Sequence, residues 1–228
     1  MITPTRAATV LLIVALTAAA CGGDDNNTTA SPTVASTSAP ASPQTEPTAD
    51  PAGEALAAGL QYLAPLVLQP PDVPAEFTLR NNQAIGPRDA AVANIGIQPL
   101  ARYIDGSDLE GAWAAFFTQE DRALSSIVYA FATPAGATGL VGTFAALEPA
   151  DYPAADTVER VQAGAIEDAS QMMLYVLTGA RTLEYTWAQG RYAGQIVLRY
   201  AGETGNPDDV AFVVSLARTQ TERMRAAP

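Results

Sequence analysis

Hydrophobic residues from position 55 onwards recur with the spacings that regular secondary structure imposes. Leu56, Leu60 and Leu63 fall on one helical face, and Asp50-Pro51 before them supplies a capping residue and a proline at the first helical position. Pro65 ends or kinks this helix, because proline has no backbone N–H to donate. The pattern predicts that the folded part of the chain opens with a short helix.

Two later stretches share one layout: a strand, a polar turn, a second strand and a helix that begins at a proline. The first comprises Ala112 to Thr118, Ser126 to Thr133 and the helix from Pro134; the second comprises Thr182 to Ala188, Gln195 to Ala201 and the helix from Asn206-Pro207. Further strands are expected at Glu76 to Asn81, Val158 to Ala165 and Gln171 to Leu177, and a brief helix at Pro87 to Asn94. The order predicts an α+β fold, an antiparallel sheet with helices packed mainly on one face, and the shared layout suggests two related strand-strand-helix units.

The first 20 residues have the pattern of a signal peptide. Met1 to Arg6 carry one positive charge, Ala7 to Leu16 form an apolar stretch, and Thr17 to Ala20 are small residues suited to cleavage. The apolar stretch is shorter than the ~20 residues that a membrane-spanning helix needs. The sequence therefore predicts that residues 1–20 are removed and that the protein is exported.

Small residues stand directly before Cys21, the only cysteine of the chain. Here the sequence resembles the lipobox of bacterial lipoproteins, although Ala18 stands where leucine is more usual. The resemblance implies a lipid on Cys21 that holds the protein on the extracytoplasmic face of the cell membrane. The alternative is an ordinary secretory signal cut after Ala20, which would leave Cys21 as a lone thiol.

The segment from Gly22 to Glu54 has the composition of a spacer. It holds one Val, no aromatic residue and five prolines among Ser, Thr and Ala, so it cannot bury enough apolar surface to fold. We therefore expect three parts: a signal peptide (1–20), a lipidated cysteine with a disordered tether (21–54) and a single α+β domain (55–228).

Charge limits the partners of that domain. Residues 55–228 hold 11 Arg and 19 acidic residues, a net charge of −8. A surface of this sign repels phosphate backbones and anionic headgroups, so nucleic acid is not expected as a partner. The lipid on Cys21 must supply the membrane attachment by itself.

The missing residue types exclude much chemistry. The chain has no His and no Lys, so it offers neither a Ser-His-Asp triad nor a Schiff-base lysine, and the usual zinc, copper and haem ligands are absent. We expect no cofactor and no enzyme activity. Glycoside hydrolysis by an acid pair and calcium binding need only carboxylates. Asp105 to Glu110 is the best calcium candidate and Glu203 to Asp209 the next, but a solvated turn explains the first and helix capping the second, so no metal site is expected.

Aromatic residues on the predicted strands suggest a ligand pocket. Tyr129 and Phe131 share one strand face, Tyr185 and Trp187 share another, and Tyr200 lies on a neighbouring strand beside Arg199. A sheet face bearing these six residues would hold an apolar or sugar ligand, with Arg199 meeting an acidic group. The alternative is that the aromatic residues fill the core between sheet and helices.

A second resemblance concerns the domain. Leu66 to Phe77, with leucines, an acidic residue, prolines and then an aromatic residue, is similar to the opening of extracytoplasmic actinobacterial domains, some of them sensor-like, and Ile196 to Arg225 repeats their final strand and helix. We expect a non-catalytic binding or sensor-like module. The alternatives are a carboxylate-dependent hydrolase of envelope glycans and a purely structural envelope protein. The partner expected besides the membrane is an apolar or sugar ligand or an envelope protein.

Overall fold

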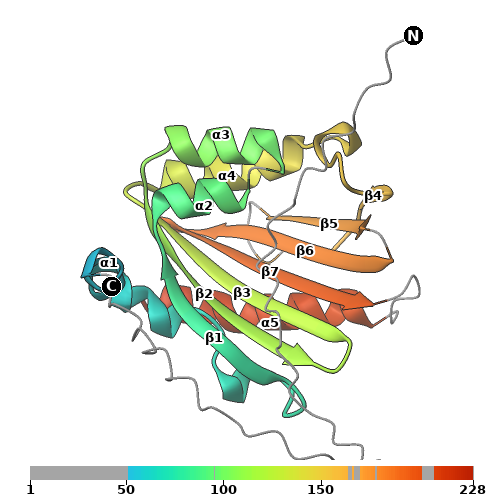
Figure 1. Cartoon of the computed structure of the whole chain (residues 1–228), viewed down its shortest axis with the longest axis horizontal. Helices are drawn as coiled ribbons and strands as arrows, with labels where there is room; N and C mark the ends of the chain where they lie inside the picture. Colours follow the sequence, from blue (N-terminus) through green and yellow to red (C-terminus); the bar gives the residue numbers. More distant parts are fainter. Residues whose placement is uncertain are drawn as a thin grey trace, which may run out of the picture.

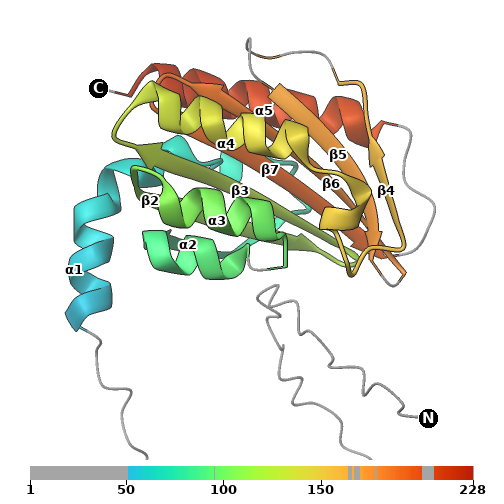
Figure 2. The same cartoon turned by 90° about the horizontal axis from the view of Figure 1, so that it is seen from above.

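The computed structural model describes residues 51–94, 96–163, 166, 170–177, 179–201 and 208–227. Within these residues a seven-stranded sheet lies between two layers of helices (Figures 1 and 2). The predicted signal peptide, Cys21 and residues 22–50 of the tether lie outside the described part. The first helix, α1, spans Pro51–Leu60, so it begins where the Asp50-Pro51 pattern predicts and already includes the last four residues assigned to the tether.

The sheet is antiparallel throughout, which confirms the predicted α+β class. Its strands are β1 (Thr78–Ile85), β2 (Leu109–Gln119), β3 (Arg122–Phe131), β4 (Thr157–Arg160), β5 (Ser170–Leu177), β6 (Ala180–Gln189) and β7 (Tyr192–Ala201). They lie in the order β1-β2-β3-β7-β6-β5-β4. The β2–β3 and β6–β7 hairpins therefore meet at the centre of the sheet, where Val128 of β3 is opposite Gly194 of β7.

One face of the sheet, the first face, packs against the C-terminal helix α5 (Asp209–Arg225) and the 3-10 helix η1 (Gln61–Leu66). The short helix η2 (Pro70–Asp72) follows η1. This core includes Leu63 and Leu66 from η1, Val213, Ala217 and Met224 from α5, and Phe117, Leu124, Tyr185, Trp187, Ile196 and Leu198 from the strands.

The other face, the second face, packs against α2 (Pro87–Ala93), α3 (Gln98–Gly106) and α4 (Pro134–Ala146), which is followed by η3 (Pro149–Asp151). Figure 1 shows these helices together over one end of the sheet, while α5 runs along the opposite face. The second core includes Leu100, Ile104, Leu140, Phe144 and Leu147 against Tyr129, Phe131, Met173 and Ala193.

The sequence suggested helices mainly on one face of the sheet. In the structure they cover both faces. The reason is visible in β3, where Leu124 and Val128 belong to the first core while Ile127 and Tyr129 contact the second. The paired strands and the helix of both predicted units are present, although Asn206-Pro207, the predicted start of the second helix, lies outside the described residues. The helices α4 and α5 lie on opposite faces. The two units therefore share a layout without occupying equivalent positions.

Polar contacts fix α5 to the first face. Ser126, which is fully buried, accepts a hydrogen bond from the Leu68 backbone N–H (2.9 Å) and donates one to Gln220 of α5 (2.8 Å). Ion pairs secure both ends of the helix, Arg122 with Asp209 at 2.7 Å and Arg223 with Asp72 at 2.8 Å. These contacts join segments from the beginning, middle and end of the domain.

Candidate functional site

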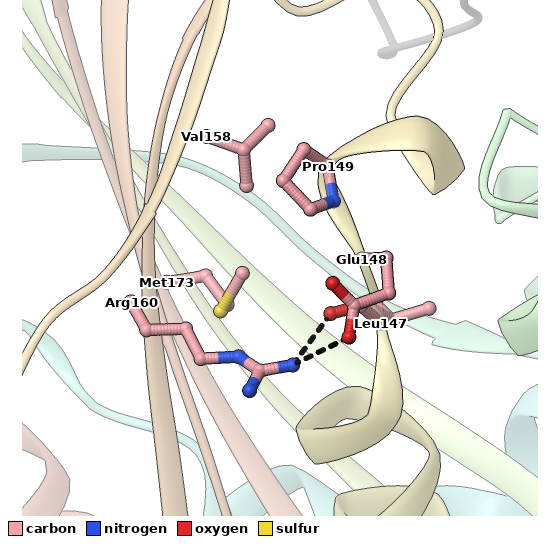
Figure 3. Close-up of a pocket in the computed structure, with 6 residues that line it drawn as sticks. All are labelled: Leu147, Glu148, Pro149, Val158, Arg160 and Met173. Carbon is pink, nitrogen blue, oxygen red and sulfur yellow. Dashed lines mark hydrogen bonds and ion pairs between the residues drawn. The ribbon is translucent and has the colours of Figure 1, made fainter.

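A pocket opens on the second face, where the end of α4 meets the edge of the sheet (Figure 3). Its volume is about 220 Å³, and its lining combines four apolar residues with one acid and one base: Leu147, Pro149, Val158 and Met173, with Glu148 and Arg160. Leu147 and Glu148 follow α4, while Val158 and Arg160 alternate along β4. Met173 of β5 is directly opposite Arg160 in the ladder, so the two side chains share one face.

Arg160 is the cation of this pocket. Its Nη2 donates a hydrogen bond to the Leu147 carbonyl (2.7 Å), an acceptor at the C-terminal end of α4, and lies 3.8 Å from Glu148 Oε1. Both charged side chains are largely exposed, 49% for Arg160 and 72% for Glu148, so this ion pair contributes at most ~1 kcal/mol. The hydrogen bond to the Leu147 carbonyl positions the guanidinium. A ligand that displaced Glu148 from Arg160 would therefore break only a weak ion pair.

A buried polar network lies farther in on the same face. Tyr129 donates a hydrogen bond to Gln195 Oε1 (3.0 Å), and Gln195 donates in turn to the Glu184 carboxylate. All three side chains are buried. Burial raises the pKa of Tyr129, and the negative charge of Glu184 raises it further, although a hydrogen bond with Asn94 opposes both effects. Tyr129 therefore stays protonated far above neutral pH.

Tyr152 links this network to the pocket. Burial raises its pKa most, the charges of Glu184 and Asp151 raise it further, and the positive charge of Arg160 opposes the shift. The charges of both Glu184 and Arg160 therefore act on the Tyr152 hydroxyl. Met173, which lines the pocket, is directly opposite Glu184 in the β5–β6 ladder.

The six residues predicted to form a pocket do not come together. Tyr185, Trp187 and Tyr200 belong to the core of the first face, whereas Tyr129 and Phe131 belong to that of the second. The five aromatic side chains are at most 7% exposed. Arg199 of β7 is opposite Ala123 and Thr182, on the second face, and is half-buried. The sheet itself separates the two aromatic groups.

The acidic turn proposed for calcium makes other contacts. Asp108 accepts a hydrogen bond from Thr133 (2.7 Å), and Glu110 pairs with Arg191 (3.1 Å). In the part of the chain that the structure describes, no group of three or more acidic or cysteine side chains is placed to hold a metal ion. The second acidic loop falls mostly on residues 202–207, which lie outside the described residues.

Sequence reasoning missed Arg160, Met173, Glu184 and Gln195. The signal for Glu184 is the alternation of Thr182, Glu184 and Thr186 with Leu183, Tyr185 and Trp187 along β6. This pattern predicts one buried face and one solvated face. The structure instead buries both faces, because α4 lies over the side of β6 that carries Thr182, Glu184 and Thr186.

Comparisons with known proteins identify the fold. No family model and no curated protein sequence matches the chain. The fold is similar to that of the extracellular domain of PknH from Mycobacterium tuberculosis, with a TM-score of 0.50 and 10% sequence identity, over 72% of this chain and 96% of that one. A weaker similarity, with a TM-score of 0.41 and 13% identity, covers 75% of this chain and 96% of a Rv0999 ortholog from Mycobacterium smegmatis. The predicted resemblance to extracytoplasmic actinobacterial domains is thus supported at the level of the fold.

No helix among the described residues has the length and apolarity that crossing a bilayer requires.

Proposed function

We propose that this protein is a non-catalytic binding or sensor-like module that a lipid on Cys21 anchors to the extracytoplasmic face of a cell membrane. The observation that carries the binding role is the pocket at the end of α4, which combines apolar walls with one guanidinium. Binding sites in proteins have this composition: mostly apolar lining with a few polar groups that orient the ligand.

The pocket favours binding over hydrolysis. Glycosidases need two carboxyl groups ~5–10 Å apart across the bound sugar. Among the described residues that line the pocket, Glu148 is the only carboxylate, and Arg160 is its partner. The chain also has no His or Lys to act as a general base. The described residues that line this pocket therefore do not supply the acid pair that the alternative, a glycan hydrolase, would need.

The extracytoplasmic location rests on two independent arguments. The lipobox at Cys21 follows a signal-peptide pattern in the sequence. The fold of the described residues is similar to that of an extracellular domain, which supports export without identifying any ligand.

The size of the pocket restricts what it holds. Pockets for drug-sized ligands usually enclose ~300–1,000 Å³, whereas this one measures about 220 Å³. We infer that it accepts one apolar or sugar group of a larger envelope molecule. The net charge of −8 on residues 55–228 disfavours strongly anionic ligands at long range.

The test uses the mature chain with Cys21→Ala, which removes the lipid. Lipids and glycans are screened by thermal shift, where a ligand at a hundredfold excess over its Kd stabilises the native state by ~2.7 kcal/mol and raises Tm by roughly 5–10 °C. The Kd of each ligand that raises Tm is then measured for the variant Arg160→Gln and for the control variant Arg199→Gln. Arg199 is a second arginine on the same face of the sheet. We expect only Arg160→Gln to weaken binding.

Loss of binding with Arg199→Gln alone would place the site away from the pocket. A screen in which nothing raises Tm would refute the binding module and leave the structural envelope protein.

A further inference from the structure

The sheet beneath α4 is polar where a helix-covered core is normally apolar. Thr182, Glu184 and Thr186 of β6 and Gln195 of β7 are at most 6% exposed, and α4 contacts both strands. Within the described part of the chain, the hydroxyls of Thr182 and Thr186 have no hydrogen-bond partner. Buried hydroxyl groups almost always have one, because an unbonded one is costly. We call these four residues the polar row.

The polar row lies next to the pocket already described. Glu184 is directly opposite Met173, whose side chain lines that pocket. The charges of Glu184 and Arg160 both act on the hydroxyl of Tyr152. A ligand entering the pocket would therefore reach the polar row once Met173 and the adjoining part of α4 moved aside.

The two halves of α4 are held by different kinds of contact. At the N-terminal end, Thr133 caps the Gly136 N–H (3.3 Å), Thr133 donates to Asp108, and Tyr103 donates to the Gly136 carbonyl (2.6 Å). The C-terminal half is held mainly by apolar packing of Leu140, Phe144 and Leu147 in the second core, and among the described residues Arg160 adds a hydrogen bond to the Leu147 carbonyl. Because the C-terminal half borders the pocket, its unwinding would open the pocket towards the polar row, at the cost of exposing these apolar side chains.

The glycines of α4 show the same asymmetry. A Cβ at Gly136 would collide with Asp108 and Phe131, and one at Gly139 would collide with Tyr103, so close packing requires both glycines. A Cβ at Gly142 would meet nothing within 4 Å. Glycine in a helix interior lowers the stability of the helix relative to alanine. Gly142 therefore weakens the C-terminal half of α4 although no packing contact requires it.

We propose that the pocket is the mouth of a larger site, which opens when the C-terminal half of α4 unwinds and exposes the polar row to a neutral, hydroxyl-rich ligand of the sugar class. The choice of ligand rests on the proposed function. Thr and Gln side chains both donate and accept hydrogen bonds, as sugar hydroxyls do. Glu184 accepts hydrogen bonds from hydroxyls and repels an acidic group. Phe144 and Tyr152, which pack in the same cluster, supply apolar surface.

Hydrogen exchange tests the opening without any ligand. In the mature Cys21→Ala chain, we expect the amides of residues 140–144 to exchange at least tenfold faster than those at the centre of β3 and β7. Low concentrations of denaturant should barely change this exchange rate, because the opening is local. Gly142→Ala should slow this exchange about fivefold, because alanine is the better helix former. Gly59→Ala is the matched control: it lies in α1, a Cβ there also meets nothing within 4 Å, and α4 exchange should not change.

Exchange of residues 140–144 at the rate of the central strands, with the same denaturant dependence, would show that α4 opens only with global unfolding and would overturn the proposal.

Ligand-observed NMR tests the ligand class with glucose, galactose and mannose, each beside its uronic acid. We expect at least one neutral sugar to bind and its uronic acid to bind at least tenfold more weakly. Gly142→Ala should weaken sugar binding about fivefold, and Glu184→Gln should narrow the difference between sugar and acid. Equal binding of both, or no binding of any neutral sugar, would refute the ligand class. Lipid binding that depends on Arg160 would in that case leave the proposed function intact.

Discussion

Gly194 offers the sharpest test of the packing at the centre of the sheet. It lies in β7 opposite Val128 and Trp187, and the indole of Trp187 rests directly on it. A Cβ at this position would lie 2.5 Å from Cε2 and 2.8 Å from Cη2 of that ring. Trp187 is fully buried and stacks on Tyr185 with ring centroids 5.7 Å apart, so the indole has no space to move into.

The cost of Gly194→Ala follows from that geometry. Inserting a methyl group into a packed core costs typically ~1–3 kcal/mol, and we expect the upper end because the obstacle is a rigid ring. For a domain of this size, ~3 kcal/mol lowers Tm by roughly 6–12 °C. Gly142→Ala is the matched control: the same change at an exposed helix position without a clash should raise Tm by roughly 2–4 °C.

Both variants are measured by calorimetry on the mature Cys21→Ala chain. The reasoning would be refuted if Gly194→Ala melted within 2 °C of the parent protein, because Trp187 would then have room that the structure does not show.

Three further predictions concern the anchor, the tether and pH. Cys21→Ala should release the protein from membranes with the domain still folded; a wild-type chain that fails to incorporate a clickable fatty acid would contradict this. Deleting Asn26 to Thr48 should leave Tm unchanged, and a shift equivalent to ~1 kcal/mol or more would mean that the segment docks on the domain. Stability should fall as pH rises above about 10, where tyrosines ionise in the unfolded chain while the raised pKa values of Tyr129 and Tyr152 keep these two protonated in the fold. Urea midpoints at pH 9 and 11 measure the effect, and equal midpoints would contradict it.

Most strands and helices are predictable from local signals. Prolines start α2 and α4 where the sequence predicts helices, and the polar turns between paired strands fall where expected. The helix α3 was missed, although Leu100 and Ile104 have helical spacing. The Asp-Gly-Ser sequence at its end was assigned to a loop instead. Turn residues mark where a helix stops as well as where a loop begins, and local sequence does not separate these cases.

The candidate site was far less predictable, because it depends on which element covers which face. Alternation along β6 separates Tyr185 and Trp187 from Glu184 but does not say that α4 covers the side with Glu184. The pocket joins the end of α4 to β4 and β5, so Arg160 acquires its role only through tertiary packing. The same ambiguity grouped aromatic residues from opposite sides of the sheet into one predicted pocket.

The central pairing of β3 with β7 has a consequence for how the chain folds. The hydrogen bond from Tyr129 to Gln195 closes 66 residues, and the one from Ser126 to Gln220 closes 94. Such long closures slow folding relative to local hairpins. A chain that emerges from the ribosome with its N-terminus first can form the β2–β3 hairpin early. The free edge of β3 then stays unpaired until β7 has been synthesised. The apolar side that faces α5 stays uncovered until the last helix has emerged. Until then the intermediate presents an unpaired strand and a bare apolar surface, the two features that make partly folded chains associate.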